Sequence, residues 1–220
     1  MTDYATGSAG AREDLCRYLA ACYYEPSRDF SEERLFDSML TAASAIDPGL
    51  AESARKLGAA FDAQDLQTLL VDYTRLFIGP SQPVAMPYAS FWLTDDASKR
   101  HEATMTVLDF YEQGGFGVSD DFRELPDHVA AELEFLYLLI FSQNQAQFGG
   151  NANELTAANT MHSRFVAEHL GAWIGSFVEA VRAGAETAFY RELAEFTERF
   201  VGLEADLAPA AASADLSPIG

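Results

Sequence analysis

The sequence predicts an all-α fold, a single-domain bundle of about 8–12 helices. Apolar residues recur at helical spacing along nearly the whole chain, and no segment shows the alternation that is typical of a strand. Apolar residues make up 49% of the 220 residues, which is enough for one sizeable core, and no segment is repeated. These features indicate a folded domain over residues 11–203, a flexible N-terminus over 1–10 and a flexible tail over 204–220.

The first third of the chain divides into helical segments that are separated by turn residues. Leu15, Leu19 and Cys22 form one apolar stripe in the first segment. A glycine followed by a proline, Gly79-Pro80, ends the last segment, as expected at a helix C-terminus. The helices expected in this part of the chain are residues 11–24, 31–46, 50–61 and 65–78.

The remainder of the chain begins with residues 79–94, which hold three prolines and are expected to form the one long loop. The glycine-rich segment 114–121 breaks the chain again. The helices expected after the loop are residues 97–113, residues 125–140, a long pattern that follows Gly149-Gly150 and runs to residue 181, and residues 185–202.

Composition excludes several functional classes. The chain carries 14 basic and 34 acidic residues, a net charge of −20, which argues against nucleic acid or an anionic membrane as partner. No apolar run approaches a membrane span, and no secretory signal is visible, so a cytoplasmic protein without stable membrane insertion is expected. Cys16 and Cys22 are expected to be buried thiols in a reducing compartment.

The segment 125–140, with the sequence LPDHVAAELEFLYLLI, is apolar on every side, so it predicts a central helix. Pro126 suits its first helical position, and Asp127 suits the positive end of the helix dipole. His128 and Glu132 are four residues apart and therefore share a face. A buried glutamate costs free energy unless it has a partner, so Glu132 requires an explanation beyond capping.

Three interpretations of His128 and Glu132 follow from the residues alone. They can form a satisfied structural network, in which Glu132 bonds His128 or a neighbouring backbone group. They can hold a metal in a helical metal-dependent enzyme, although the remaining histidines show no second paired motif. They can also line a recognition pocket. The chain shows no arrangement of nucleophile and base and no phosphate-binding loop, so an enzyme is not expected.

Four motifs in order resemble the TorD/DmsD family of cytoplasmic molybdoenzyme chaperones, which is related to the NarJ chaperones of nitrate reductase. The motifs are DYTRLFIGP, PYASFW, LPDHVAAELEFL and FVAEHLGAW. The resemblance spans about residues 12–200. It implies an all-helical fold without a cofactor of its own, which binds the twin-arginine leader of an apo-molybdoenzyme. Such binding delays export of that redox enzyme until its molybdopterin cofactor is inserted and its subunits are assembled.

The resemblance also implies which residues bind the leader and the client. The expected binding residues are Tyr88, Ser90, Trp92, Asp127, His128 and Glu132. The residues expected to support them by packing or loop position are Tyr73, Phe77, Gly79, Pro87, Pro126, His169 and Trp173. The sequence departs from the family where Met86 replaces a first proline and where Ala89 stands in place of a common glutamate. The second departure removes one candidate partner for an arginine.

Acidic residues concentrate around this predicted site. Residues 95–134 contain eleven acidic and three basic residues. A twin-arginine leader has a basic head and an apolar stretch, and carboxylates beside an aromatic groove match both parts. The prediction is therefore a leader-binding chaperone, with Asp127 at the entrance and Glu132 one turn deeper on the face of His128. A structural adaptor for a folded partner is an alternative, and monomer and homodimer both remain open.

Overall fold

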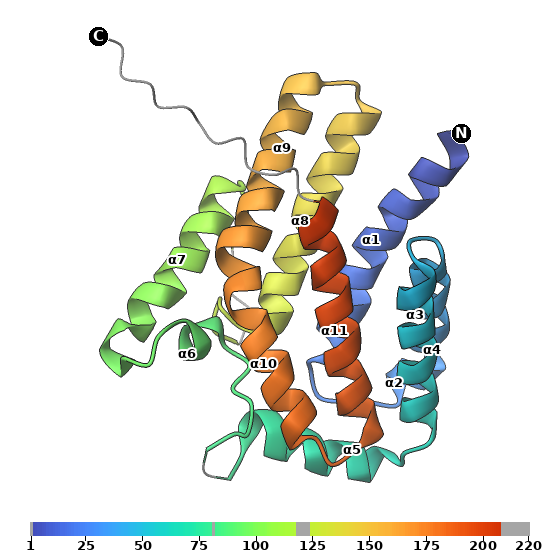
Figure 1. The fold of residues 1–220 in the computed structure, drawn as a ribbon, viewed down its shortest axis with the longest axis vertical. Helices are drawn as coiled ribbons and strands as arrows, with labels where there is room; N and C mark the ends of the chain where they lie inside the picture. Colours follow the sequence, from blue (N-terminus) through green and yellow to red (C-terminus); the bar gives the residue numbers. More distant parts are fainter. Residues whose placement is uncertain (1, 81, 118–123, 208–220) are drawn as a thin grey trace.

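The computed structural model describes residues 2–80, 82–117 and 124–207 (Figure 1). Its α-helices are α1 (Thr2–Cys22), α2 (Asp29–Glu32), α3 (Leu35–Ser44), α4 (Pro48–Asp62), α5 (Leu66–Tyr73), α6 (Ala89–Leu93), α7 (Arg100–Gln113), α8 (Val129–Phe148), α9 (Ala152–Arg164), α10 (Gly171–Gly184) and α11 (Ala188–Leu207). Two π-helical segments, η1 (Thr74–Ile78) and η3 (Phe165–Leu170), and one 3₁₀ segment, η2 (Ala97–Lys99), join them. Within these ranges an isolated bridge is the sole β pairing, which confirms the predicted all-α bundle.

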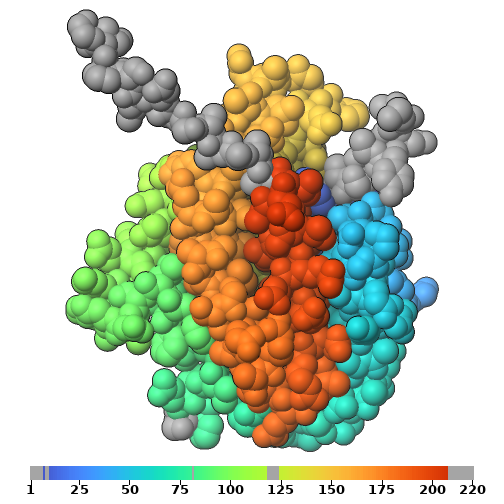
Figure 2. Space-filling view, viewed as in Figure 1, coloured from blue at the N-terminus to red at the C-terminus, as the bar shows by residue number. Residues whose placement is uncertain are grey.

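The helices form one bundle in which α8 lies behind α10 and α11 (Figure 1). α1 packs along α8, and α3 and α4 pack as a pair beside α1 and α11. α9, η3 and α10 follow one another as one long, nearly continuous helical segment. α6 packs against α10. Figure 2 shows α10 and α11 side by side on the near face, between the α3–α4 pair and the α6–α7 segment. Every helix within the described ranges is too short or too polar to traverse a bilayer.

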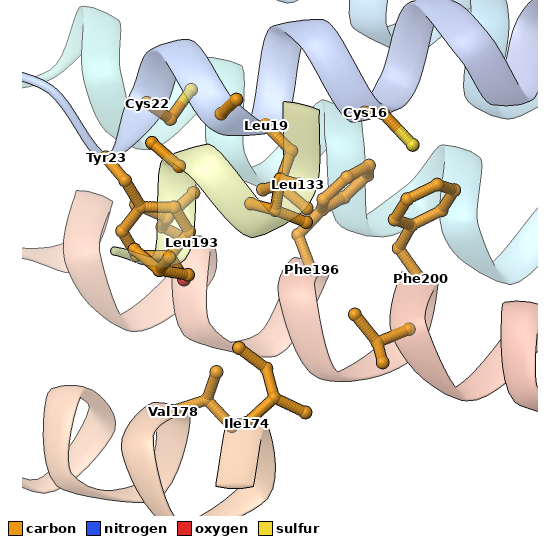
Figure 3. Packing of buried hydrophobic residues seen from close by; sticks show 14 of the residues in the cluster. Cys16, Leu19, Cys22, Tyr23, Leu133, Ile174, Val178, Leu193, Phe196 and Phe200 are labelled. Atoms are coloured by element: carbon orange, nitrogen blue, oxygen red, sulfur yellow. The ribbon is translucent and has the colours of Figure 1, made fainter. Parts of the chain in front are cut away.

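The core lies where α1, α8, α10 and α11 meet. Leu19, Leu133 and Phe196 are fully buried there, and Figure 3 shows side chains from all four helices converging. α8 is buried on several sides, in agreement with its apolar pattern. Cys16 and Cys22 are buried free thiols, which confirms the predicted burial.

Several boundaries differ from the predicted ones. α8 begins at Val129 rather than at Pro126, because His128 adopts an extended conformation and serves as its N-cap. α6 lies inside the segment that was expected to be a continuous loop, whereas Gly79 ends η1 with a positive φ of 67°, as a C-terminal glycine does.

The predicted ends of the domain also fall within helices. α1 starts at Thr2, and α11 continues past residue 203 with Glu204 buried. Residues 118–123 of the acidic stretch and residues 208–220 of the predicted tail lie outside the described residues. The division of the chain into a domain and two flexible ends therefore stays a prediction.

Candidate functional site

Two segments that are far apart in the sequence meet at the start of α8. An antiparallel bridge pairs Tyr88, at the end of the long loop, with His128. The Ala89 amide donates to the Asp127 carbonyl at 2.9 Å, and the Val129 amide donates to the Pro87 carbonyl at 2.8 Å. These two bonds fix Tyr88 beside the first turn of α8, so two predicted site residues are brought into contact.

Asp127 has a different role from the predicted one. Its side chain is fully buried, and its Oδ2 accepts a hydrogen bond of 2.9 Å from the amide of Ser90. Ser90 lies in the first turn of α6, whose N-cap residue Tyr88 supplies no side-chain cap of its own. Asp127 therefore caps α6 from a distant segment. The predicted position at the entrance of the site is wrong, because Asp127 is buried, and direct binding of an arginine by Asp127 stays a prediction.

His128 is the N-cap of α8. Its Nδ1 accepts a hydrogen bond of 3.2 Å from the Ala130 amide, so the neutral imidazole is the form that fits this cap. The ring is stacked on Tyr24 at a centroid distance of 6.0 Å and meets the edge of Tyr88 at 5.3 Å. Burial lowers the pKa of His128 to about 4, although Glu124 and Asp127 oppose this shift. The imidazole is therefore uncharged at neutral pH.

Tyrosines and glutamates surround His128. We call Tyr24, Tyr73, Tyr88, Glu124 and Glu134 the Tyr–Glu cluster. The Tyr88 hydroxyl donates to Glu124 at 2.8 Å, and the Tyr24 hydroxyl donates to Glu134 at 3.2 Å. Burial raises the pKa of Tyr73 to about 12, and the charge of Glu124 adds to this shift. The two carboxylates are exposed, and the rings of Tyr24, Tyr73 and Tyr88 are partly buried beside them.

The Glu132 side chain is bonded to other partners than the His128 ring, which was one of the partners predicted for it. Its Oε1 lies 2.9 Å from His169 Nε2, and its Oε2 accepts a hydrogen bond of 2.9 Å from Trp173 Nε1. Glu132 is completely buried, and burial raises its pKa while His169 and Trp173 partly offset that rise. The two residues of the late motif therefore hold Glu132 in the core, away from any surface that a leader could reach.

The other predicted residues are mainly structural. Trp92 donates to the Met86 carbonyl at 2.7 Å and meets the edge of Phe177, so it anchors the loop to α10. Phe77 is buried and packs against the half-buried ring of Tyr73. The Pro126 carbonyl accepts a 2.7 Å bond from the Tyr111 hydroxyl, which ties the segment before α8 to α7.

The sequence prediction missed Tyr24, Glu124 and Glu134 as members of the site. Glu124 and Glu134 belong to the acidic stretch that surrounds the predicted site, but their pairing with tyrosines was not visible. Tyr24 lies more than 100 positions from Glu134, at the end of the first predicted helix. A helical stripe of Arg17, Ala21 and Tyr24 is the one sequence signal that could have placed this tyrosine.

This arrangement suits recognition of a cationic group better than coordination of a metal. No group of three or more His, Cys, Asp and Glu side chains arranged to hold a metal ion occurs among the described residues. His128 uses Nδ1 for its cap, and Glu132 is bound elsewhere, so the predicted pair does not converge. Exposed carboxylates beside tyrosine rings offer hydrogen-bond acceptors and stacking faces for a guanidinium group.

Comparisons with known proteins found relatives in sequence and a similar solved structure. TorD chaperone proteins are similar in sequence: that of Vibrio vulnificus strain YJ016 is 28% identical over 176 residues, covering 80% of each chain. The TorD chaperone of Shewanella loihica is 25% identical over 184 residues, covering 80% of this chain and 79% of the relative. A crystal structure from Archaeoglobus fulgidus, described as a redox enzyme maturation protein, is 20% identical with a TM-score of 0.49, covering 87% of this chain and 92% of that one.

A family model also matches more than half of the chain. The sequence model of the nitrate reductase delta subunit family matches residues 43–179, which include the loop, the start of α8 and the partners of Glu132. The curated relatives are named chaperones, in agreement with the expectation that the chain is not an enzyme. The chain belongs to the nitrate reductase delta subunit family.

Proposed function

We propose that this protein is a cytoplasmic chaperone that binds the twin-arginine leader and the apo-form of a molybdopterin-containing oxidoreductase. Binding delays export while the cofactor is inserted and the partner subunits are assembled. Family membership and the TorD chaperones among its relatives support this proposal. The leader's basic head binds at the Tyr–Glu cluster.

The observation that carries this proposal is the pairing of two exposed carboxylates with tyrosines, without a basic partner for either among the residues that the structure describes. Glu124 accepts a hydrogen bond from the Tyr88 hydroxyl, and Glu134 accepts one from the Tyr24 hydroxyl, so each carboxylate has a neutral partner. Partial burial raises the pKa of Glu134, and the bond from Tyr24 partly offsets that rise. A hydroxyl occupies one acceptor position of each carboxylate and leaves others free for an arginine. Arginine forms forked hydrogen bonds with carboxylates and stacks on aromatic rings, and both partners are present.

The net charge of the chain favours the same partner. A chain of net charge −20 attracts a basic peptide over a distance set by ionic strength. This attraction raises the rate of encounter, and the Tyr–Glu cluster supplies the close contacts that slow dissociation. The neutral His128 adds no positive charge to the surface at neutral pH.

Isothermal titration of the full chain with a synthetic twin-arginine leader tests the proposal. Glu124→Gln is expected to weaken binding about tenfold, because it removes a charge that contacts an arginine. The matched control is Glu112→Gln, an exposed glutamate of α7 in the same acidic stretch but outside the Tyr–Glu cluster. It removes the same charge from the chain and is expected to leave the affinity within about twofold.

A second leader, in which both arginines are replaced by lysines, distinguishes forked recognition from simple charge attraction. Wild type is expected to bind the lysine leader more weakly, because lysine cannot form the forked contact. Equal affinity for both leaders, together with equal effects of Glu124→Gln and Glu112→Gln, would contradict the proposed site. Binding of the folded client enzyme but of neither leader would instead support the adaptor alternative.

A further inference from the structure

A surface groove runs from the Tyr–Glu cluster along the seam between α1 and α8. One wall is formed by Arg17, Ala21 and Tyr24 of α1. The other wall is formed by Glu134, Tyr137 and Leu138 of α8. Each set follows helical spacing of three or four residues, so each forms one stripe along its helix. The cavity has a volume of about 410 Å³ and is open to solvent.

The groove changes character along its length. At the end near His128, the Tyr24 hydroxyl donates to Glu134. Further along α8, the Tyr137 ring is stacked on Phe141 at 6.2 Å, and Phe141 is 38% exposed. The guanidinium of Arg17 lies 5.9 Å from the centre of the Tyr137 ring. The groove is therefore acidic at one end, aromatic in its middle, and basic beside Tyr137.

We propose that this groove binds the apolar stretch that follows the arginine pair, so that the leader lies parallel to α8. This inference rests on the proposed function and adds a direction to it. Tyr24 belongs both to the Tyr–Glu cluster and to the groove wall, so the two surfaces are continuous. The acidic end attracts the basic head, and Arg17 repels it from the far end.

The lining of the groove suits a short apolar segment. Its α8 wall, from Glu134 to Leu138, spans about 6 Å at 1.5 Å per residue, and an extended peptide covers that distance with about two residues. Tyr137, Leu138 and Phe141 present aromatic and aliphatic surface, which is the chemistry that an apolar peptide segment requires.

Photo-crosslinking of the full chain tests the direction. The probe is p-benzoylphenylalanine at position 125, an exposed residue beside Glu124, or at position 141, an exposed residue whose ring packs on Tyr137 of the groove wall. Position 125 is expected to capture leader residues next to the arginine pair. Position 141 is expected to capture apolar residues that follow the pair, and mass spectrometry identifies the captured residues.

The outcomes separate the groove from the proposed function. Capture at position 125 without capture at position 141, or capture of the basic head at position 141, overturns this inference and leaves the proposed function standing. Absence of leader binding in titration overturns both. Binding with capture at neither position overturns the groove.

Affinity provides a second measurement. Phe141→Ser is expected to weaken binding of the full leader about fivefold and to leave binding of a leader without its apolar stretch unchanged. Met105→Ser is the matched control, because Met105 is an apolar side chain of similar exposure on α7, away from the groove. Equal loss of affinity for the full and the shortened leader in Phe141→Ser would overturn the assignment of the groove to the apolar stretch.

Discussion

The two ends of α8 use the same kinds of side chain in different ways. Near its C-terminal end, Arg12 of α1 donates through Nε to Glu204 at 2.8 Å, and His162 Nε2 lies 2.9 Å from the same carboxylate. Near its N-terminal end, the carboxylates of Glu124 and Glu134 accept from tyrosine hydroxyls. Each region contains histidine and glutamate, but within the described ranges the acid of the first region is paired with an arginine and the acids of the second with tyrosines.

This difference separates a structural network from a binding surface. Burial raises the pKa of Glu204, but the hydrogen bonds and charges of Arg12 and His162 outweigh burial and hold that pKa below its usual range. The network is nearly closed to solvent and joins α1, α9 and α11. The Tyr–Glu cluster is exposed, and its negative charge remains available to a partner.

Breaking the buried pair is expected to have the largest effect on stability. Arg12→Met removes the cation and leaves Glu204 buried without its main partner, which typically costs about 3–5 kcal/mol. Urea unfolding measures this loss as a lower free energy of unfolding. Leader affinity below the unfolding transition is expected to be unchanged, because the network lies at the other end of α8.

A double variant provides the control for that experiment. Adding Glu204→Gln to Arg12→Met removes the unpaired charge and is expected to restore part of the lost free energy. A loss below about 1 kcal/mol in Arg12→Met would show that Glu204 is satisfied without the arginine. A large loss of leader affinity would place part of the binding surface at this end of the molecule.

The pH dependence of stability is expected to report on His128. Its pKa is lowered from 6.5 to about 4 in the folded chain, so the unfolded chain binds more protons between these values. The contribution of His128 is therefore fully present above pH 6.5 and is lost as pH falls towards 4. The difference of about 2.5 pKa units corresponds to about 3 kcal/mol.

His128→Asn isolates this contribution, because asparagine can cap α8 and does not titrate. Free energies of unfolding are compared for wild type and variant from pH 4 to pH 7. The free energy of unfolding of wild type minus that of His128→Asn is expected to rise with pH up to 6.5 and then to stay constant. A difference that is independent of pH would show that His128 can be protonated in place.

The sequence predicted the helical architecture well because helical spacing is a local property. Apolar periodicity identified most of the helices, and Gly79 and the apolar α8 were interpreted correctly. The start of α8 was misplaced because Pro126 suits a first helical position equally well. His128 is instead extended because it pairs with Tyr88, and that pairing joins segments 40 positions apart.

Long-range partners explain why the site was predicted only in part. Glu132 shares a helical face with His128 in the sequence, but its actual partners lie 37 and 41 positions away on η3 and α10. Tyr24 and Glu134 are separated by 110 positions. One sequence read alone contains no signal that pairs such residues, so the residue types were predictable and their contacts were not.

Asp127 is expected to affect stability more than recognition. Asp127→Asn keeps an acceptor for the Ser90 amide, so the free energy of unfolding is expected to change by less than about 1 kcal/mol. Asp127→Ala removes the cap of α6 and is expected to cost about 1–2 kcal/mol. In titrations with the leader, Asp127→Asn is expected to lower the affinity less than Glu124→Gln does. The reverse order would mean that Asp127 becomes accessible when the leader binds.

Ionic strength is expected to change the association rate of the leader and to leave the fold intact. Raising salt from about 0.01 to 0.5 M shortens the Debye length from about 30 Å to a few ångströms. Stopped-flow association is therefore expected to slow about tenfold or more, while the dissociation rate changes less. A rate constant that does not respond to salt would remove electrostatic steering from the binding mechanism.

Hydrogen–deuterium exchange with and without the twin-arginine leader tests most directly whether the two ends of α8 have different roles. Binding at the Tyr–Glu cluster is expected to slow exchange in residues 17–24, 86–92 and 124–138. Residues 198–207, which contain Glu204, are expected to exchange at the same rate in both samples. Slower exchange around Arg12 and Glu204, with no change at the start of α8, would contradict the assignment of the binding surface.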